Sequence, residues 1–543
     1  MPALDTLIVG GDIVDGAGAV PRRCDIGITD DRIAYLGLSH DVQAHRVVDA
    51  SGMYVLPGLI DPHSHSDWSV LGNAEAYSTI HQGVTTEVVG NCGVTYAPLG
   101  AAAVESAQSA LRAMGYEGPV DWRSFGSLLD TVHSARTAQN LVWFVGHTAI
   151  RSAARSNAES TGVDECRERI RLVEDALDAG AIGLSSGLEY GDGRFADRQE
   201  LADLARVVGR RDGMYASHIR NRDSGLGAAV DEFFDVVHQG GVRAQLSHLN
   251  VRYGTGADPG AWHRAVDRVV DERRRGSEVL ADMTPYPHGI GMAAGLLPGW
   301  LIERPAAEAA QMLHDNEVRA RVRADCDRYW RFVHRGHWER VSLGVSITHP
   351  EWEGLTFPEI AARHGRDEWE CLFDILAAAG ADIGNVQLLG HLFTEDHLAD
   401  AIGHDHFLLG VDAFTTRRDG ALHTRTRHPL FYFGHTHYLA HHVPAGTLTF
   451  EDAVHRMTGM VADHFRIRDR GYLRPNKYAD VVVLDPDILA RTDTWVLPQA
   501  YASAARHVWV NGTAVVTEGQ HTGTLPGRLL RCRRTHNTKE HTR

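Results

Sequence analysis

The residues of this chain most able to do chemistry are histidines, one cysteine and one aspartate that each follow a short apolar run. Imidazole, thiolate and carboxylate groups are the usual protein ligands of Zn²⁺. A single residue of these types is more often packed or solvated than bound to metal. Their shared position after apolar runs is what favours a metal site. The residues in that position are His63, His65, Cys92, His218, His248 and Asp412.

His63 and His65 have the spacing of two metal ligands on one extended segment. Side chains at i and i+2 of an extended segment point to the same side and can hold one metal ion. Spacing alone is weak support, because 33 histidines among 543 residues also produce chance pairs such as His404 and His406. The position of His63 and His65 directly after the first strand-like run of the central region favours the metal interpretation.

Strand-like runs alternate with helix-like stretches through the middle of the chain, and these elements must position the ligands. Such alternation is typical of a parallel sheet with crossover helices. Eight runs predict an α/β fold, a TIM-type (β/α)8 barrel, in which the carboxyl ends of the strands face the active site. The predicted strands are 59–61, 86–90, 141–145, 182–184, 214–216, 244–246, 279–281 and 407–410. The predicted helices are 164–179, 199–211, 227–239 and 260–275.

The gap between the last two runs is too long for a single crossover helix. We expect an insertion at about 298–344, after barrel strand seven, that covers the barrel mouth and moves. Both chain ends read as short strands separated by turns, including a hairpin at Asn511-Gly512. They predict one small β-sandwich built from residues 1–57 and 466–543 around a barrel domain of residues 58–465.

Charge and composition narrow the class of protein. Lys and Arg number 54 against 70 Asp and Glu, and the net charge of -16 disfavours nucleic acid and anionic membranes as partners. No long apolar segment or secretory leader is recognisable, so we expect a cytoplasmic enzyme of a small-molecule substrate. The six cysteines are scattered singly and predict no disulfide framework. The sequence leaves the oligomeric state open.

The order of these motifs resembles the amidohydrolase superfamily. An H-x-H pair, then Gly90-Asn91-Cys92-Gly93, then single histidines at strand ends, then a late aspartate is similar to its N-acyl-D-amino-acid deacylase branch. The likeness spans nearly the whole chain. Further matching segments are Pro57–Asp61, Gly146–Thr148 with Arg151, Gly183–Tyr190, His428-Pro429, Arg456–Thr458 and Gly471–Asp485.

The resemblance implies a zinc enzyme that cleaves an amide C–N bond with metal-activated water. It implies a tight zinc held by Cys92, His218 and His248. It also implies a second, weaker metal position or water site lined by His63, His65 and Asp412. Asp412 would act as general base toward the water. Cys92 would take the bridging place that a carboxylated lysine holds in other members, because Lys477 and Lys539 both lie outside the barrel.

The resemblance also suggests residues that contact substrate. Tyr190 and Tyr286 match substrate-facing positions, while His147, Arg151 and Asn250 are further candidates near the site. Glu189 receives no role. Two alternatives stay open: a cyclic amide or lactam hydrolase on the same metal site, and a non-catalytic relative. The missing bridging lysine counts against the first, and the complete ligand set counts against the second.

Two departures from the family pattern concern the substrate's α-carboxylate. The resembling deacylases bind this group with a lysine two residues after the sixth-strand histidine and an arginine after the late His-Pro. Here those positions are Asn250 and Leu430. We expect a substrate that lacks a free α-carboxylate, unless nearby arginines rebuild the contact. Those arginines are Arg252, Arg425 and Arg427.

Overall fold

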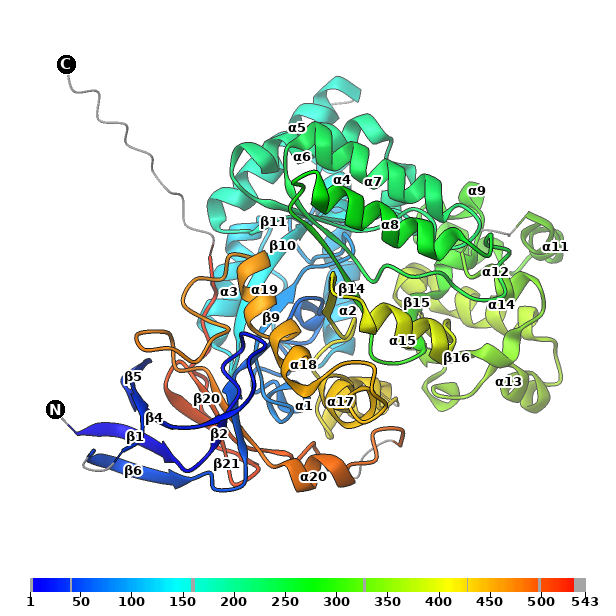
Figure 1. The fold of residues 1–543 in the computed structure, drawn as a ribbon. Coiled ribbons are helices and arrows are strands. Elements are labelled where there is room, and N and C mark those ends of the chain that lie inside the picture. Colours follow the sequence, from blue (N-terminus) through cyan, green and yellow to red (C-terminus); the bar gives the residue numbers. More distant parts are fainter. Residues whose placement is uncertain are drawn as a thin grey trace, which may run out of the picture.

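The computed structural model describes residues 3–39, 42–157, 162–325, 329–426, 428–496 and 500–531. At its centre lies an eight-stranded parallel sheet in sequential order, flanked by helices (Figure 1). Each strand corresponds to one predicted run, and the structure confirms the barrel. The strands are β8 (Leu59–Asp61), β9 (Val84–Val89), β10 (Asn140–Gly146), β11 (Gly183–Gly187), β12 (Met214–His218), β13 (Arg243–Leu246), β14 (Val279–Met283) and β18 (Phe407–Leu409).

The barrel closes between β8 and β18 beyond the carboxyl ends of these two strands. Ser64 and Ala413 form an isolated parallel bridge. The backbone N–H of Asp412 donates to the carbonyl of His63 (2.9 Å), and that of His65 donates to the carbonyl of Ala413 (2.7 Å). The first and last barrel segments are therefore joined at the residues that the sequence singles out as ligands.

Crossover helices cover the outside of the barrel, and the four predicted helices are confirmed to within two residues at each end. Their apolar faces pack on the strands, as amphipathic helices of this fold require. The helices between barrel strands are α1 (Tyr77–Ile80), α2 (Val104–Ala113), α3 (Phe125–Ala135), α4 (His147–Asn157), α5 (Gly162–Ala179), α6 (Arg198–Arg210), α7 (Leu226–Gly240), α8 (Ala261–Arg274) and α15 (Glu395–Gly403). The last barrel strand is followed by α16 (Gly420–Arg425), α17 (Leu430–His437) and α18 (Phe450–Arg456).

The inside of the barrel is filled with apolar side chains and closed at the end away from the ligands. Helix α19 (Gly459–His464) lies at this end. Its Val461 and the following Phe465 pack among buried barrel residues including Ile60, Phe144 and Leu408. The barrel interior is thus a packed core, and only the opposite end is available for a site.

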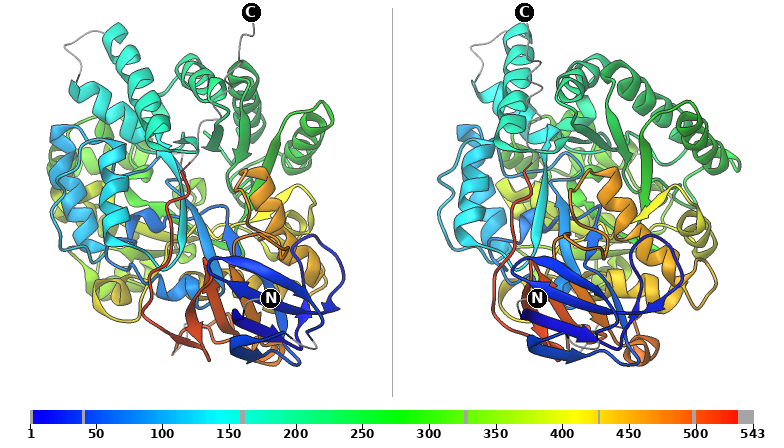
Figure 2. Two further views of the ribbon diagram at one scale, coloured as in Figure 1. Left: turned by 90° about the vertical axis from the view of Figure 1, so that its left-hand side faces the viewer. Right: turned by 60° about the vertical axis from the view of Figure 1, so that its left-hand side comes forward.

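Both chain ends join in a β-sandwich beside the barrel, as predicted (Figure 2). One sheet has the order β5-β4-β1-β6 and the other β22-β21-β20-β19-β7-β2-β3. Antiparallel pairing of β7 with β19 ties the N-terminal part to the C-terminal part. The predicted hairpin turns at Asn511 and Gly512, whose φ angles of 50° and 79° suit a two-residue turn. The domain boundaries after residues 57 and 465 stay predictions.

The strands of the first sheet are β1 (Leu4–Val9), β4 (Asp25–Thr29), β5 (Arg32–Gly37) and β6 (Ala44–Asp49). Those of the second are β2 (Asp12–Ile13), β3 (Arg22–Arg23), β7 (Tyr54–Pro57), β19 (Val481–Leu484), β20 (Ala505–Val510), β21 (Thr513–Thr517) and β22 (Gln520–His521). The short helix α20 (Pro486–Arg491) connects β19 to β20.

The insertion between β14 and β18 is longer than the predicted 298–344 span. It contains an antiparallel sheet of order β15-β17-β16, with β15 (His288–Met292) before the predicted span and β17 (Gln387–His391) after it. The segment His288-Gly289-Ile290-Gly291-Met292 lacks a strand-like sequence, because two glycines interrupt it. The other elements are β16 (Val341–Val345), α9 (Gly299–Ile302), α10 (Ala306–Met312), α11 (Asn316–Asp325), α12 (Arg331–His334), α13 (Phe357–His364) and α14 (Glu368–Ala379).

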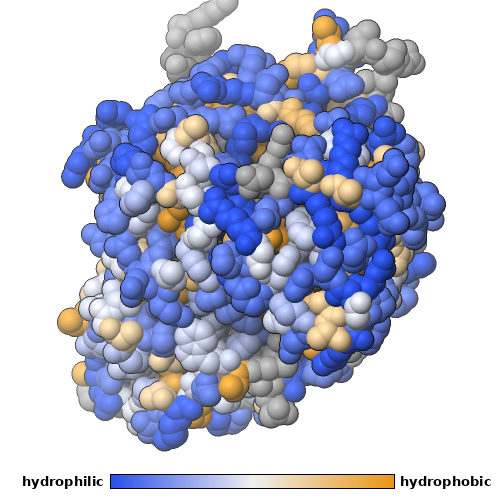
Figure 3. All heavy atoms as spheres, turned by 90° about the vertical axis from the view of Figure 1, so that its right-hand side faces the viewer, coloured by the Kyte–Doolittle hydropathy of each residue, from blue (hydrophilic) through white to orange (hydrophobic). Residues whose placement is uncertain are grey.

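The outer face on the side of the insertion is mainly hydrophilic, with small scattered apolar patches (Figure 3). Among the described residues, no helix combines the length and the apolar character needed to cross a membrane. This outer face therefore presents no large continuous apolar patch.

Candidate metal centre and active site

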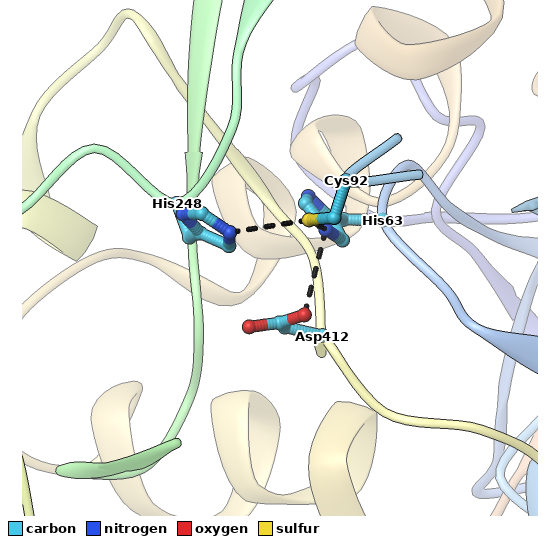
Figure 4. A group of neighbouring side chains, drawn as sticks. All are labelled: His63, Cys92, His248 and Asp412. Carbon is cyan, nitrogen blue, oxygen red and sulfur yellow. Dashed lines mark hydrogen bonds and ion pairs between the residues drawn. The ribbon is translucent and has the colours of Figure 1, made fainter. Parts of the chain in front are cut away.

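Four donor side chains from four strand ends meet at the open end of the barrel (Figure 4). His63 follows β8, Cys92 follows β9, His248 follows β13 and Asp412 follows β18, and their ligand atoms all lie within 4.8 Å of one another. Cys92 Sγ is 3.3 Å from His63 Nε2 and 3.4 Å from His248 Nε2, while Asp412 Oδ1 is 3.5 Å from His63 Nε2. Two imidazoles, a thiolate and a carboxylate at this spacing suit Zn²⁺.

Three of the four donors stand on strained backbone. The φ angles of Cys92, His248 and Asp412 are 55°, 35° and 56°, in the left-handed region that side-chain-bearing residues seldom adopt. Each such residue costs on the order of 1–3 kcal/mol, and such strain gathers at functional sites. The fold thus maintains an unfavourable conformation in order to turn these side chains toward one point.

The turn that carries Cys92 has room only for glycine on both sides. A Cβ on Gly90, whose φ is 75°, would lie 2.3 Å from the carbonyl oxygen of Phe144. A Cβ on Gly93 would lie 2.6 Å from the backbone nitrogen of Gly187. The Gly-Asn-Cys-Gly motif is explained by this close approach of the thiol-bearing turn to β10 and β11.

The electrostatics of the group favour a thiolate among imidazoles. Burial alone would raise the pKa of the Cys92 thiol, but the charge of His63 holds it well below its ordinary value. Burial together with the charge of Arg222 lowers the pKa of His248 to about 4. Deprotonated sulfur and a neutral imidazole are the forms that bind metal.

His65 and His218 border the four-donor group. His65 Nε2 is 3.2 Å from Asp412 Oδ1, and its ring stacks on Trp68 with 4.5 Å between centroids. The ring of His218 lies edge-on to that of His248, 4.5 Å away between centroids. All six residues singled out from the sequence therefore come together in one place.

Their grouping differs from the two triads that the resemblance implies. The compact group takes Cys92 and His248 from the implied tight site, and His63 and Asp412 from the implied weaker one. The thiol contacts one imidazole of each triad, a position compatible with the bridging place expected of it. Which donors hold which ion stays a proposal.

Asp282 is a supporting residue that the sequence reasoning missed. Its Oδ1 lies 3.0 Å from His63 Nδ1 and accepts a hydrogen bond from the backbone N–H of His248 (3.0 Å). Gln245 donates to its other oxygen (2.6 Å). A carboxylate in this place fixes the ring orientation of a metal-binding histidine. Its signal in the sequence was a carboxylate at the end of the seventh predicted strand.

A second missed feature is a buried layer of two arginines and two carboxylates behind His218. His218 Nε2 donates to Glu189 (2.9 Å), and Arg252 forms ion pairs with Glu189 and Asp223. Burial alone would raise the pKa of Glu189, but the charge of Arg252 and the hydrogen bond from His218 hold it well below its ordinary value. Arg222 Nη1 donates to His248 Nδ1 (3.0 Å), and its Nη2 lies 3.3 Å from His218 Nε2. The layer holds both histidine rings from outside.

The two tyrosines predicted to face substrate lie in different surroundings. Tyr190 lines the site, where its hydroxyl donates to the carbonyl of Cys92 (3.2 Å) and lies 3.4 Å from His218 Nδ1. Tyr286 is fully buried, stacks on His437 and donates to the carbonyl of Thr494 (2.5 Å). Tyr286 does not line the cavity that opens onto the four-donor group. Only Tyr190 is placed to touch substrate there.

The positions of the missing carboxylate contact are both buried. Asn250 donates to the carbonyl of His248 (2.5 Å), and Leu430 packs in an apolar cluster with Trp68. Arg252 is held by the two carboxylates of the buried layer. Arg427 lies outside the described residues, as does the side chain of Arg425.

His147 and Arg151 stand at the start of α4 and interact with α6. His147 Nε2 is 2.8 Å from Glu200 Oε1, and Arg151 also forms an ion pair with Glu200. Neither side chain lines the cavity at the metal group. Their contacts are those of a buried ion cluster that joins two barrel helices, so the structure does not support their expected contact with substrate.

A cavity of about 40 Å³ opens onto the four-donor group, which is also called the metal group below. His65, Cys92, His218, His248 and Asp412 form its floor. The inserted subdomain supplies the opposite wall, with Gly289–Met292, Tyr329, Leu392 and Phe393. The insertion therefore lies at the barrel mouth, as predicted, while its movement stays a prediction.

The class of protein follows from this fold and metal group, and comparison with known families agrees. Residues 46–516 match the amidohydrolase family Amidohydro_3. The chain belongs to this family.

Several relatives are similar over almost their full length. The N-acyl-D-glutamate deacylase of Alcaligenes xylosoxydans xylosoxydans is 32% identical over 97% of this chain and 96% of its own. The D-aminoacylase of the same organism is 29% identical over 97% of each chain.

Solved structures extend this likeness to the whole fold. A Bordetella bronchiseptica N-acyl-D-glutamate deacylase, complexed with zinc and a phosphonate inhibitor, matches with a TM-score of 0.79, at 30% identity over 98% of this chain and 100% of that one. A D-aminoacylase with a binuclear metal centre matches with a TM-score of 0.78, at 26% identity over 97% and 100%. The dihydropyrimidinase of Brevibacillus agri, 15% identical over 97% and 99% with a TM-score of 0.53, shares the fold alone.

Proposed function

We propose that this chain is a zinc-dependent hydrolase of linear N-acyl amides, similar in chemistry to D-aminoacylase and N-acyl-D-glutamate deacylase. The observation that carries the proposal is the four-donor group of His63, Cys92, His248 and Asp412, of which the last three line the floor of a cavity. A structural zinc site would be closed on all sides, whereas a catalytic one keeps an open position. Asp412 is the donor with the greatest access, since 16% of its side chain is exposed.

The chain's own residues account for the proton transfers of amide hydrolysis. Zinc in such a group supplies Lewis acidity toward a carbonyl oxygen and makes water a better nucleophile near neutral pH. Asp412 accepts the proton of the attacking water and returns it to the leaving nitrogen. His65, 3.2 Å from Asp412 Oδ1, holds this carboxylate in place.

The proposed metal content is one tight zinc and a second, weaker ion. Cys92 and His248 would hold the tight ion, with His63 and Asp412 in reach. A second ion would share Cys92 and use His65 or His218, which border the group. Zinc titration of the metal-free protein, followed by calorimetry, tests this content: two binding events of unequal affinity support it, and a single event removes the second ion.

The substrate is proposed to lack a free α-carboxylate. Asn250 and Leu430 are buried and engaged, and Arg252 is paired with Glu189 and Asp223. Arg222 lines the cavity, but its two Nη atoms are directed at the rings of His248 and His218. Two lost charge-assisted hydrogen bonds would remove roughly 1.5–3 kcal/mol each.

Kinetics on a zinc-loaded and a chelator-treated sample test the function. The panel contains N-acyl amino acids, their carboxamides, and cyclic amides. Zinc-dependent cleavage of linear amides, with a preference for the carboxamide over the matched N-acyl-D-amino acid, is expected. Equal or better cleavage of the free acid would show that the carboxylate contact has been rebuilt, and cleavage of cyclic amides alone would replace the proposed reaction.

A further inference from the structure

A second cavity of about 370 Å³ continues from the small cavity at the metal group. The two share the side chains of Trp68, Val94, Tyr190 and Met292, so they lie side by side. The larger one reaches the surface at exposed residues such as Arg304, Ala306 and Ile347. Its volume falls in the range of about 300–1,000 Å³ that is typical of small-molecule sites. The larger cavity is called the apolar chamber below.

Apolar side chains from both the barrel and the insertion line the apolar chamber. Ala110 and Met114 come from α2 and the residue that follows it, while Ile302 and Ala309 come from α9 and α10 of the insertion. The lining is completed by further apolar residues, namely Tyr96, Ala113, Ala294, Ala306, Val345, Ile347, Ala381 and Ile383.

The polar side chains that line the apolar chamber are Ser106, Thr148, Asp192, Arg304, Asn385 and Gln387. Three of them are paired with neighbouring side chains, whereas Thr148 Oγ1 is buried with no hydrogen-bond partner among the described residues. Arg304 donates to Glu308 (2.5 Å), Asn385 donates to Asp382 (3.1 Å), and Asp192 pairs with Arg155 (3.4 Å). Apolar side chains outnumber these polar ones, and both charged side chains are paired, so a charged ligand would find little to compensate its lost hydration there. Burial of an apolar group there would instead be favourable, because its apolar surface would leave water.

The position of the apolar chamber identifies its occupant as part of the substrate. It adjoins the metal group through four shared side chains, and the outer surface on the insertion side is mainly hydrophilic (Figure 3). A substituent on the scissile amide can therefore extend from the metal group into the chamber. A small substituent such as a methyl group would leave most of the chamber unused.

We propose that the apolar chamber binds a bulky apolar substituent of the amide substrate, either a medium-length acyl chain or an aromatic or branched group on the amine side. This inference rests on the proposed function. It adds that the substrate is a lipophilic amide and that the insertion, together with α2, selects it.

Two matched series of substrates distinguish the two sources of the apolar group. In one series the acyl chain grows from acetyl to octanoyl on a fixed small amine, and in the other the amine grows in apolar bulk on a fixed acetyl group. We expect kcat/KM to rise by about fourfold per added methylene for the first few methylenes in one series. A flat or falling profile in both series would overturn the apolar chamber as a substrate site.

Filling the apolar chamber tests its location. Ala110→Phe places a ring in the chamber from α2, and it should remove most of the gain measured between the smallest and the largest substrate of the responsive series. Ala102→Phe, at an exposed alanine that lines neither cavity, is the matched control and should keep the full gain. An unchanged ratio in Ala110→Phe, with the variant folded by circular dichroism, would contradict the inference.

A binding measurement separates this inference from the proposed function. The uncharged fluorescent probe N-phenyl-1-naphthylamine should bind the wild type and Ala102→Phe, and bind Ala110→Phe at least tenfold more weakly. If Ala110→Phe does not fold, Ala309→Leu fills the same chamber from α10 and serves in its place. Zinc-loaded protein that hydrolyses no amide would overturn the proposed function, whereas hydrolysis without size dependence or probe binding would overturn the inference alone.

Discussion

The two walls of the active-site cavity are built in opposite ways. The floor consists of side chains at the ends of barrel strands, three of them on strained left-handed backbone and held from behind by Asp282 and the buried arginine layer. The opposite wall comes from the insertion and includes glycines and single apolar side chains of β15 and its surroundings. The difference fits the proposals made above, in which barrel residues carry the chemistry and the inserted subdomain selects the substrate.

The largest expected effect comes from removing a metal ligand at the floor of the cavity. Cys92→Ala removes the donor that contacts both His63 and His248, and we expect loss of zinc and a fall in activity of 10³-fold or more, because a catalytic zinc has few protein ligands. Cys166→Ala, on α5, is the control and should keep both. Zinc content by atomic emission, measured beside activity, checks the result, and full zinc occupancy in Cys92→Ala would exclude the thiol as a ligand.

Asp412→Asn separates proton transfer from metal binding. An amide keeps the shape of the carboxylate but cannot act as a base, so turnover should fall about 10²-fold or more while the tight zinc remains. Steady-state kinetics with zinc analysis of the same sample measure both quantities. Unchanged turnover would remove Asp412 from the mechanism.

Glu189→Gln tests the layer behind the floor. The variant weakens the acceptor of His218 Nε2 and leaves Arg252 with an incomplete partner, so zinc affinity should fall about 10- to 100-fold. Competition with a chelator measures this affinity without reference to activity. Asp175→Asn, a change at an exposed carboxylate of α5, should leave the affinity unaltered.

The fourth prediction compares the mobility of the insertion with that of the barrel. If the insertion opens to admit substrate, hydrogen exchange of α9 to α12 should be faster than that of α5 to α8, by at least tenfold. Exchange read by mass spectrometry decides this. Equal protection of the two sets would show that both walls are equally rigid.

The smallest effect concerns the buried ion cluster of His147, Arg151 and Glu200. Burial alone would raise the pKa of Glu200, but the hydrogen bond from His147 and the charge of Arg151 lower it from 4.5 to about 2. The ionised carboxylate therefore stabilises the fold above pH 4.5, and this contribution is lost as pH falls toward 2. At pH 7 the free energy of unfolding of Glu200→Gln should be about 2 kcal/mol smaller than that of the wild type, and its unfolding temperature should be lower. The difference between the two proteins should shrink below pH 4.5. A difference independent of pH would contradict the assignment.

The sequence predicted the floor of the cavity better than the wall. Continuous apolar runs and the residues directly after them are local signals that can be read from the sequence. All six predicted ligands follow such runs, and they lie together because the strands end at the same end of the barrel. Strand β15 was missed because its glycines give no local strand signal. Asp282 and Glu189 were not given their roles, since these depend on contacts between residues distant in the chain. The substrate roles of Tyr286, His147 and Arg151 were expected from neighbouring motifs, but packing directs these side chains elsewhere.

The closure of the barrel sets an order of assembly. Ser64 meets Ala413 across 349 residues of chain, and long-range pairing of this kind is intrinsically slow. At a synthesis rate of about 5–20 residues per second, roughly 20–70 s pass between the two segments. Three of the four donors, His63, Cys92 and His248, are made before the carboxylate of Asp412 exists. The proposed general base is therefore the last of the four donors to be synthesised, and it reaches the other three only when the last strand docks on the first.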